Sequence, residues 1–419
     1  MTKVYVDHIS PRITYAFDFI FESRGLEYQF IEDRFQADCV YSQNCLTSDP
    51  TVVMAAFMLS DKIERLKPKL AELNSGVECF SFDEVFDPIA SIFYTLSRYE
   101  EHTCLKMDEY GRFSLEQSNA PLEWLRKTMC DRWAEEVLTR TGVDLSLVKN
   151  EGQFIPTFDI DNTYAYKLKT GKIKFGSMLK DVLRRDKQRL EERKLVLSGE
   201  IPDPYDTFDT IRSVKKRFPQ TKVFWLIGKR GAKDRNISIH NSEHQELIKL
   251  LSTDGVEIGL HPSFGSFGSK SIIKVEKETL EKVCSASIDQ SRQHYLRFRV
   301  DSTYSDLLAL GFKHEYSMGY AEHVGFRSGT ARPHFWFDLK NNSISEFTLH
   351  PFAYMDGTLR EYMKLSIEES KIQIGELFDE VTRYGGDFIF IWHNETIGDS
   401  GNWKGWKDVL DFTLSLGNE

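Results

Sequence analysis

The sequence lacks most of the features that mark membrane, secreted and disulfide-rich proteins. It has only six cysteines in 419 residues, and no pair of them has CxxC spacing. No stretch approaches the roughly 18 apolar residues that a membrane-spanning helix needs. The first residues, Met1-Thr-Lys-Val-Tyr-Val, lack the basic and apolar segments of a secretion signal. These absences predict a cytoplasmic protein with free thiols and no membrane span.

Basic residues are also fewer than acidic residues. The chain has 54 Lys and Arg against 64 Asp and Glu, for a net charge of −10. This balance disfavours nucleic acid or an anionic membrane as the main partner. Hydrophobic residues make up 41% of the chain and aromatic residues 13%, enough for a large core. At roughly 150 residues per domain, the length predicts two or three domains. The oligomeric state is not indicated.

The patterning divides the chain into two unequal parts. Lys3–Val6 and Tyr28–Ile31 are predicted strands around a helix, without a glycine-rich phosphate loop. A break near Gly142–Gly152 predicts a boundary between a smaller α/β domain of unknown role, residues 1–145, and a larger domain, residues 152–419. In the larger part strands and helices alternate, which is typical of a parallel sheet or a (β/α) barrel.

The most informative stretch is Phe154–Tyr164, a predicted buried strand that leads into two acids. Asp159 and Asp161 are two residues apart, so alternation along the strand places both carboxylates on one side. Two like charges this close repel unless a cation, a proton or a substrate group offsets them. The pair therefore predicts a metal site, although such acids can also cap the following helix.

Polar residues lie at the ends of three more predicted strands: His261 after Val256–Leu260, Arg299 within Tyr295–Val300, and His393 after Asp387–Trp392. In parallel α/β folds, chemistry gathers at the carboxyl ends of strands. A single histidine at such a position is more often structural. Two carboxylates, two imidazoles and a guanidinium together predict a metal-assisted hydrolase site.

The order of these motifs resembles that of the polysaccharide deacetylases, the NodB-homology or carbohydrate esterase 4 family. Thr157-Phe-Asp-Ile-Asp161 is similar to the family's first motif, T-F-D-D-G, and Phe388–His393 to its last, an apolar strand that ends in histidine. Phe298-Arg299 resembles the third motif, F-R-P-P-Y, without its prolines. Gly259–Ser263 resembles the second motif, H-[ST]-x-x-H, but only its first histidine is present.

The resemblance implies a distorted (β/α) barrel of NodB type and a carbohydrate deacetylase that uses a divalent metal, commonly zinc. Its substrate would be an N- or O-acetylated sugar, and in the cytoplasm a glycan precursor. Carried over residue by residue, the resemblance makes Asp159 the general base and Asp161 and His261 metal ligands. It makes Arg299 the residue that orients the base, and His393 the donor of a proton to the leaving group.

The incomplete second motif leaves two predicted metal ligands, whereas catalytic zinc normally has three from the protein. The candidates for the third are Ser263, Ser266, His294 and His323.

Substrate contacts are expected near the end of the last strand, from Trp392, Asn394 and Trp403. Packing in the core is the simpler role for Trp392. Arg327 can bind an anionic substrate group or pair with an acid of the first domain. The stretch Leu349–Asp356 adds another acid to the larger domain.

The smaller domain contributes a narrower resemblance. Phe86–Glu101, together with Gly325–Thr330, resembles a two-domain bacterial subgroup in which an uncharacterised α/β domain precedes the deacetylase-like one. Pro88 stands where a helix can begin, and the charged stretch Arg98-Tyr-Glu-Glu101 ends that helix. These charges form either an exposed tip or a contact with the larger domain.

Two other functions stay open. The missing histidine and prolines would also suit a catalytically lapsed carbohydrate-binding or assembly protein with the same fold. Phe158–Thr163 also matches D-x-D-x-T, the opening motif of haloacid-dehalogenase-type phosphatases, whose first Asp is a nucleophile working with Mg²⁺. That fold needs a later lysine and a paired acid that the strand ends here lack, and it leaves His261 and His393 unexplained.

Overall fold

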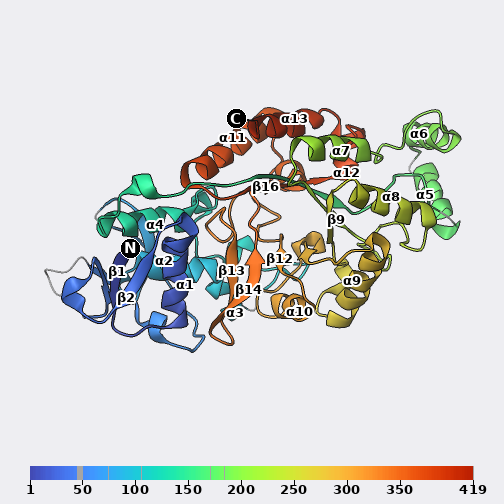
Figure 1. Ribbon diagram of the computed structural model, residues 1–419. Helices are drawn as coiled ribbons and strands as arrows, with labels where there is room; N and C mark the ends of the chain where they lie inside the picture. The colour runs from blue at the N-terminus through green and yellow to red at the C-terminus, as the bar shows by residue number, and fades with distance from the viewer. Residues whose placement is uncertain (45–50, 74, 105, 170, 184, 419) are drawn as a thin grey trace.

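The computed structural model describes residues 1–44, 51–73, 75–104, 106–169, 171–183 and 185–418. Within these ranges it is a mixed α/β structure with three sheets (Figure 1). Every helix there is too short or too polar to span a membrane. Cys39, Cys79, Cys104, Cys130 and Cys284 are free thiols, and Cys45 lies outside the described residues.

The N-terminal part contains two small sheets. The first is parallel, in the order β2-β1-β3-β4, with β1 (Thr2–Val6), β2 (Tyr28–Ile31), β3 (Cys39–Ser42) and β4 (Thr51–Val53). The second is antiparallel and consists of β5 (Lys69–Glu72), β6 (Glu78–Phe82) and β7 (Val85–Phe86). Both strands predicted in this part are confirmed.

Four helices accompany these sheets: α1 (Pro11–Ile20), α2 (Pro88–Leu96), α3 (Tyr99–Thr103) and α4 (Met129–Arg140). Helix α2 begins at Pro88, as predicted. A proline fits the first turn because it lacks an N–H that the helix would leave unpaired. The preceding Asp87 caps the helix, with Oδ1 accepting the Ala90 N–H at 2.8 Å. All nine residues of α2 are buried.

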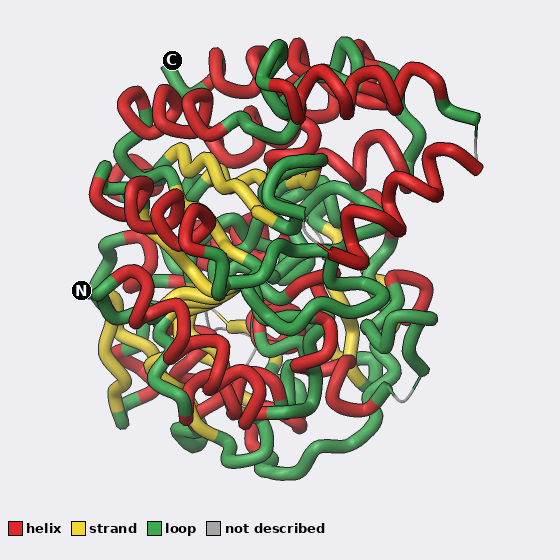
Figure 2. Tube along the Cα trace, turned by 90° about the vertical axis from the view of Figure 1, so that its right-hand side faces the viewer, coloured by secondary structure: helices red, strands yellow, loops and turns green. Residues whose placement is uncertain are grey.

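The large sheet has nine strands in the order β13-β14-β12-β11-β10-β9-β8-β16-β15 and curls as a half-barrel (Figure 2). Its paired strands are parallel except for β13 and β14, which are antiparallel. The strands are β8 (Phe154–Ile160), β9 (Lys222–Trp225), β10 (Glu257–Leu260), β11 (Gln290–Ser291), β12 (His314–Glu315), β13 (His334–Asp338), β14 (Ser343–Leu349), β15 (Tyr354–Met355) and β16 (Phe388–His393). The expected α/β class is confirmed.

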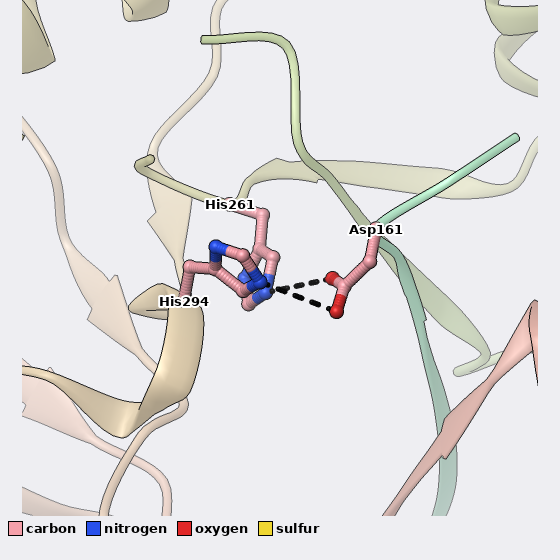
Figure 3. Close-up of side chains that lie close together, drawn as sticks. All are labelled: Asp161, His261 and His294. Atoms are coloured by element: carbon pink, nitrogen blue, oxygen red, sulfur yellow. Dashed lines mark hydrogen bonds and ion pairs between the residues drawn. The ribbon is translucent and has the colours of Figure 1, made fainter. Parts of the chain in front are cut away.

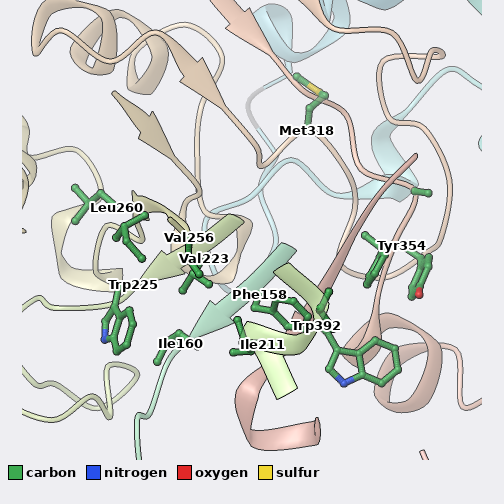
Figure 4. Packing of buried hydrophobic residues seen from close by; sticks show 14 of the residues in the cluster. Phe158, Ile160, Ile211, Val223, Trp225, Val256, Leu260, Met318, Tyr354 and Trp392 are labelled. Atoms are coloured by element: carbon green, nitrogen blue, oxygen red, sulfur yellow. The ribbon is translucent and has the colours of Figure 1, made fainter. Parts of the chain in front are cut away.

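Helices alternate with these strands and cover the sheet (Figure 1). They are α5 (Gly171–Leu183), α6 (Lys187–Ser198), α7 (Phe208–Arg217), α8 (Ser242–Thr253), α9 (Lys270–Cys284), α10 (Thr303–Ala309), α11 (Ile367–Tyr384), α12 (Asn394–Ile397) and α13 (Lys407–Leu416). The main core lies between sheet and helices, where Phe158, Trp225 and Trp392 are fully buried (Figure 4). This packing holds the carboxyl ends of the central strands in place.

One predicted strand is wrong. Residues Tyr295–Val300 do not pair with a neighbour, and the strand in this region is the two-residue β11 just before them. Tyr295 and Leu296 have φ angles of 62° and 51°, in the left-handed region. Because a strand needs extended backbone, the ladder cannot continue through these residues.

The two parts of the chain share a core. Phe337 and Leu339, at the end of β13 and just after it, pack among the apolar residues of α1, α2 and α4. The hydroxyl of Tyr15 on α1 donates to the carbonyl of Phe335 on β13. Edge strand β13 is therefore covered by the N-terminal part of the chain.

Candidate metal centre and active site

A cavity of about 330 Å³ opens at the carboxyl ends of the central strands. Asp159 reaches it from β8 and Asp161 from just after that strand. His261 follows the end of β10, His294 lies in the turn after β11, and His393 ends β16. These strands are parallel, so their carboxyl ends meet at one edge of the sheet. The sheet thus gathers two acids and three imidazoles from distant parts of the sequence.

Asp161, His261 and His294 form a cluster suited to a metal ion. Their potential ligand atoms all lie within 4.8 Å of one another. Nε2 of His261 is 3.3 Å from Asp161 Oδ1, and Nε2 of His294 is 3.2 Å from Asp161 Oδ2. Figure 3 shows both rings pointing toward the carboxylate. Among the candidates for the third ligand, the structure places His294 here.

The orientation of each ring is set by a hydrogen bond on its far side. His261 Nδ1–H donates to the Arg292 carbonyl at 2.5 Å, and His294 Nδ1–H donates to Asp234 Oδ1 at 2.8 Å. A carbonyl or carboxylate oxygen can only accept, so Nδ1 carries the proton in both rings and Nε2 is left toward the cavity. This is the arrangement in which metal-binding histidines are commonly held.

The donor set is of a kind that can hold a divalent metal ion. Two imidazole nitrogens and one carboxylate oxygen are zinc ligands, and three protein ligands leave one position open for chemistry. Ligands bound at about 2.0–2.2 Å in a tetrahedron lie roughly 3.4 Å apart, close to the separations of 3.2 and 3.3 Å observed here. Asp161 Oδ1 is also a buried oxygen with no hydrogen-bond partner, as a metal ligand would be.

Asp159 is held by an arginine, but not by the predicted one. Arg292 Nη1 donates to Asp159 Oδ1 at 2.7 Å, and both side chains are buried. Arg299 instead forms a half-exposed pair with Asp301, with Nε to Oδ1 at 3.0 Å. The contact expected of Arg299 is therefore made by Arg292, because Arg299 follows the left-handed turn that leads the chain away from the strand end. Asp159 Oδ2 lies 3.8 Å from His261 Nε2.

His393 belongs to a second buried unit. Its Nδ1–H donates to Asp356 Oδ1 at 2.7 Å, and Thr396 donates to the other oxygen of Asp356 at 2.6 Å. Asp356 is completely buried. His393 Nε2 consequently points into the cavity, 3.9 Å from Asp161 Oδ2.

The charges of the cavity favour a cation. Burial raises the pKa of Asp161, but His294 and His261 outweigh it and hold that pKa well below its usual value. Burial lowers the pKa of His294, yet Asp161 and Asp234 raise it to about 9. Burial likewise lowers the pKa of His393, and Asp356 and Asp161 hold it well above its usual value. The carboxylates thus stabilise positive charge at the centre of the site, which a metal ion would supply.

Of the four residues predicted to contact substrate, Trp392, Asn394 and Arg327 are not among those that line the cavity. Trp392 is fully buried in the core, the packing position that was the simpler expectation. Asn394 is also buried, and its amide donates to the backbone carbonyls of Asn162 and Tyr205. Trp403, in contrast, lines the cavity.

Arg327 pairs with the N-terminal part of the chain. Its guanidinium bonds to both carboxylate oxygens of Glu101, at 2.6 and 2.9 Å. Arg98, whose own backbone is left-handed with φ 51°, donates to the Arg327 carbonyl at 2.6 Å. Of the two possibilities for these residues, the structure shows the contact between the two parts of the chain.

Three residues that build the site were not singled out for these roles: Arg292, Asp356 and Asp234. Asp356 stands in the stretch Leu349–Asp356, which the sequence marked only as holding another acid. Asp234 and Arg292 show no local signal, since each is defined by a partner far away in the chain.

The sequence of the N-terminal part matches a family model. Residues 2–140 match a family of unknown function, DUF7033. No curated protein matches the chain.

Solved structures include two neighbours. One is titled "putative polysaccharide deacetylase", from Mycobacterium smegmatis, with a TM-score of 0.37 and 10% identity over 64% of this chain and 86% of that one. The other is a 4-alpha-glucanotransferase from Thermococcus litoralis, with a TM-score of 0.36 and 12% identity over 64% of this chain and 37% of that one. Similarities this slight support no inference about fold family or function.

Proposed function

We propose that the protein is a metal-dependent hydrolase that removes acetyl groups from an N- or O-acetylated sugar or glycan precursor. One observation carries the proposal: Asp161, His261 and His294 converge within 4.8 Å in a cavity that also holds Asp159 and His393. A ligand set with an adjacent acid and an adjacent imidazole is what metal-assisted hydrolysis of an amide or ester requires.

The proposal extends to the architecture. Residues 152–419 would form a distorted (β/α) barrel of NodB type, preceded by a smaller α/β domain at residues 1–145. The motif order in the sequence and the curled sheet of sequential strands β8 to β12 support the barrel. The separate four-stranded sheet, whose strands all precede residue 54, supports the smaller domain.

Asp161, His261 and His294 would hold the metal, which supplies Lewis acidity toward a water and the substrate carbonyl. Asp159 would accept the proton of the attacking water. Arg292, rather than Arg299, would orient Asp159, because it makes the 2.7 Å contact.

His393 would donate a proton to the departing amine or alkoxide. Its Nδ1–H is fixed on Asp356, so the proton that can move is on Nε2, which faces the cavity. Of the two tryptophans expected to stack on a sugar ring, Trp403 is the proposed surface, because it lines the cavity and Trp392 does not.

The contacts of Asp161 also bear on the two alternative functions, a phosphatase and a catalytically lapsed protein. Mg²⁺ in phosphatases prefers oxygen ligands, whereas Asp161 faces two imidazole nitrogens, which suit zinc. The lapsed-enzyme alternative was based on the missing histidine and prolines of the second and third motifs. His294, with Nε2 3.2 Å from Asp161 Oδ2, offers a ligand in place of that histidine. Both observations support the hydrolase.

The test separates metal binding from chemistry. Zinc content and release of acetate from N-acetylated oligosaccharides and from an O-acetyl ester are measured for the wild type, Asp161→Asn and Asp159→Asn. Asp161→Asn should lose both zinc and activity. Asp159→Asn should keep zinc and lose roughly 10²–10⁴-fold in kcat, the contribution of a general base.

Two results would contradict the proposal. Equal zinc content in the wild type and Asp161→Asn would show that Asp161 does not bind the metal, which contradicts the proposed site. Release of phosphate from model phosphoesters, with no acetate from any acetylated sugar, would favour the phosphatase instead.

A further inference from the structure

The N-terminal part of the chain reaches the candidate site through one tight turn, residues 107–113. Met107 and Phe113 pair as an isolated antiparallel bridge. Between them, Asp108 Oδ1 accepts the N–H groups of Tyr110 and Arg112 at 2.9 and 2.8 Å. Gly111 completes the turn with φ +79°, a conformation that favours glycine. These hydrogen bonds and the glycine fix the backbone conformation of the turn.

Arg112 extends from this turn to the wall of the cavity. Its side chain is 7% exposed, and Nε donates to Asp108 Oδ2 at 2.6 Å. Nη1 donates to the backbone carbonyl of Tyr295 at 3.2 Å. Tyr295 directly follows the candidate ligand His294. Arg112 thus connects the turn with the backbone next to His294, although Arg112 and Tyr295 are 183 residues apart in the sequence.

The backbone that Arg112 contacts is strained. Tyr295 and Leu296 are consecutive bulky residues in the left-handed region, which L-amino acids avoid. Such a conformation persists only where the surroundings hold it. Here the ring of Tyr110 packs on that of Tyr295 with centroids 5.4 Å apart, and the Tyr295 ring packs edge-on against His294 at 4.7 Å.

The strain has a direct effect on the metal centre. The left-handed turn begins one residue after His294. It directs the chain away from β11, whereas the His294 imidazole points back to Asp161. If Tyr295 relaxed to an extended conformation, the backbone of His294 would change direction and Nε2 would move from its place.

We propose that Arg112, with Tyr110, is a positioning residue for His294: the N-terminal turn holds the left-handed conformation that aims the third metal ligand. The proposal rests on the proposed metal-dependent function and assigns the N-terminal part of the chain a role in it. Arg112 acts through the Tyr295 carbonyl, to which its Nη1 donates.

The experiment compares zinc affinity, measured by competition with a chromophoric chelator, and the visible spectrum of the Co²⁺-substituted protein. Arg112→Met removes the donors but keeps the length of the side chain. It should weaken zinc binding on the order of 10-fold, the lower end for groups that orient a metal ligand, and should alter the Co²⁺ spectrum. Arg112→Lys, which keeps a donor and the charge, should recover most of both.

The matched control is Arg126→Met. Arg126 also belongs to the N-terminal part and contacts α11 through Glu376 at 3.3 Å, but it lies outside the cavity. It should leave zinc affinity and the Co²⁺ spectrum as in the wild type. If Arg112→Met does not fold, Tyr110→Leu makes the same test from a half-buried position, with the same expected losses.

The outcomes distinguish this inference from the function on which it depends. If the wild type binds zinc through Asp161 but folded Arg112→Met or Tyr110→Leu matches it within twofold, with an unchanged Co²⁺ spectrum, the positioning role is overturned and the metal site stands. If neither the wild type nor Asp161→Asn binds zinc, the proposed function itself fails.

Discussion

The buried ion pair between Glu101 and Arg327 joins the two parts of the chain, and we expect its loss to lower the free energy of unfolding. Both side chains are at most 4% exposed, and Arg327 donates to both oxygens of the carboxylate. Arg98 Nε donates to the same carboxylate at 2.7 Å. Glu101 therefore offsets two guanidinium groups that are both removed from water.

Replacing Glu101 by Gln keeps the shape of the side chain and removes its charge. Two buried cations then lack part of their compensation. Removing one partner of a buried ion pair destabilises by roughly 3–5 kcal/mol, because the remaining charge is left in a low dielectric. We expect the free energy of unfolding to fall by at least about 3 kcal/mol. Urea unfolding followed by tryptophan fluorescence and by far-UV circular dichroism measures this loss.

The same interface provides a matched control. Glu376 pairs with Arg126 at 3.3 Å, but the two side chains are 54% and 41% exposed. Glu376→Gln should therefore change the free energy of unfolding by less than about 1 kcal/mol. If Glu101→Gln loses no more than this control, the buried network does not stabilise the junction. Adding Arg327→Met to Glu101→Gln should lose less than the sum of the single losses, because the two residues are in contact.

Two further predictions concern stability alone. Burial lowers the pKa of His244 to about 4, and its Nε2 accepts the Trp225 indole N–H at 2.9 Å. The unfolded chain, with a histidine pKa of about 6.5, then binds a proton between pH 6.5 and 4 that the folded chain does not. The contribution of His244 to stability is complete above pH 6.5, and it falls by about 3 kcal/mol as the pH drops through this window. In His244→Gln, the midpoint of urea unfolding should depend less steeply on pH. If that dependence is unchanged, His244 is not its cause. A Cβ at Gly325, where φ is +111°, would lie 2.0 Å from the Leu125 carbonyl oxygen, so Gly325→Ala should lower the melting temperature strongly. Gly375→Ala in α11, with nothing within 4 Å, should instead add about 0.5–1 kcal/mol.

Local patterns in the sequence were sufficient where a strand was long and its end was polar. Strands β8 and β16 have six or more mostly apolar residues, and both end at the polar residues that the sequence marked, β16 one residue later than predicted. Because parallel strands bring their carboxyl ends together, Asp159, Asp161 and His393 could be expected in one place. Their roles in catalysis stay predictions.

Short strands were not predictable in the same way. Strand β11 has two residues, too few for alternation to be visible, and it is defined by its neighbours β10 and β12. With β11 missed, the strand was predicted at Tyr295–Val300, which contains Arg299 and leaves out Arg292. The F-R pattern then favoured Arg299, whereas Arg292 makes the contact with Asp159. The left-handed turn that distinguishes them is held by tertiary contacts and leaves no signal in the local sequence.

The same reasoning explains why the sequence could name His294 only as one of four candidates for the third ligand, beside Ser263, Ser266 and His323. A spacing rule looks for a second histidine a few residues after His261, on the loop that follows β10. In the sheet, however, β11 pairs with β10 through Leu260 and Ser291, so the loops after both strands begin side by side. His294 reaches Asp161 from the second of these loops, 33 residues beyond His261. The order of the strands therefore decides which loops can supply ligands at the edge of a parallel sheet. A ligand can come from the neighbouring loop if that loop is held in the right direction. Here the left-handed turn against Arg112 holds the loop so that the His294 imidazole points at Asp161.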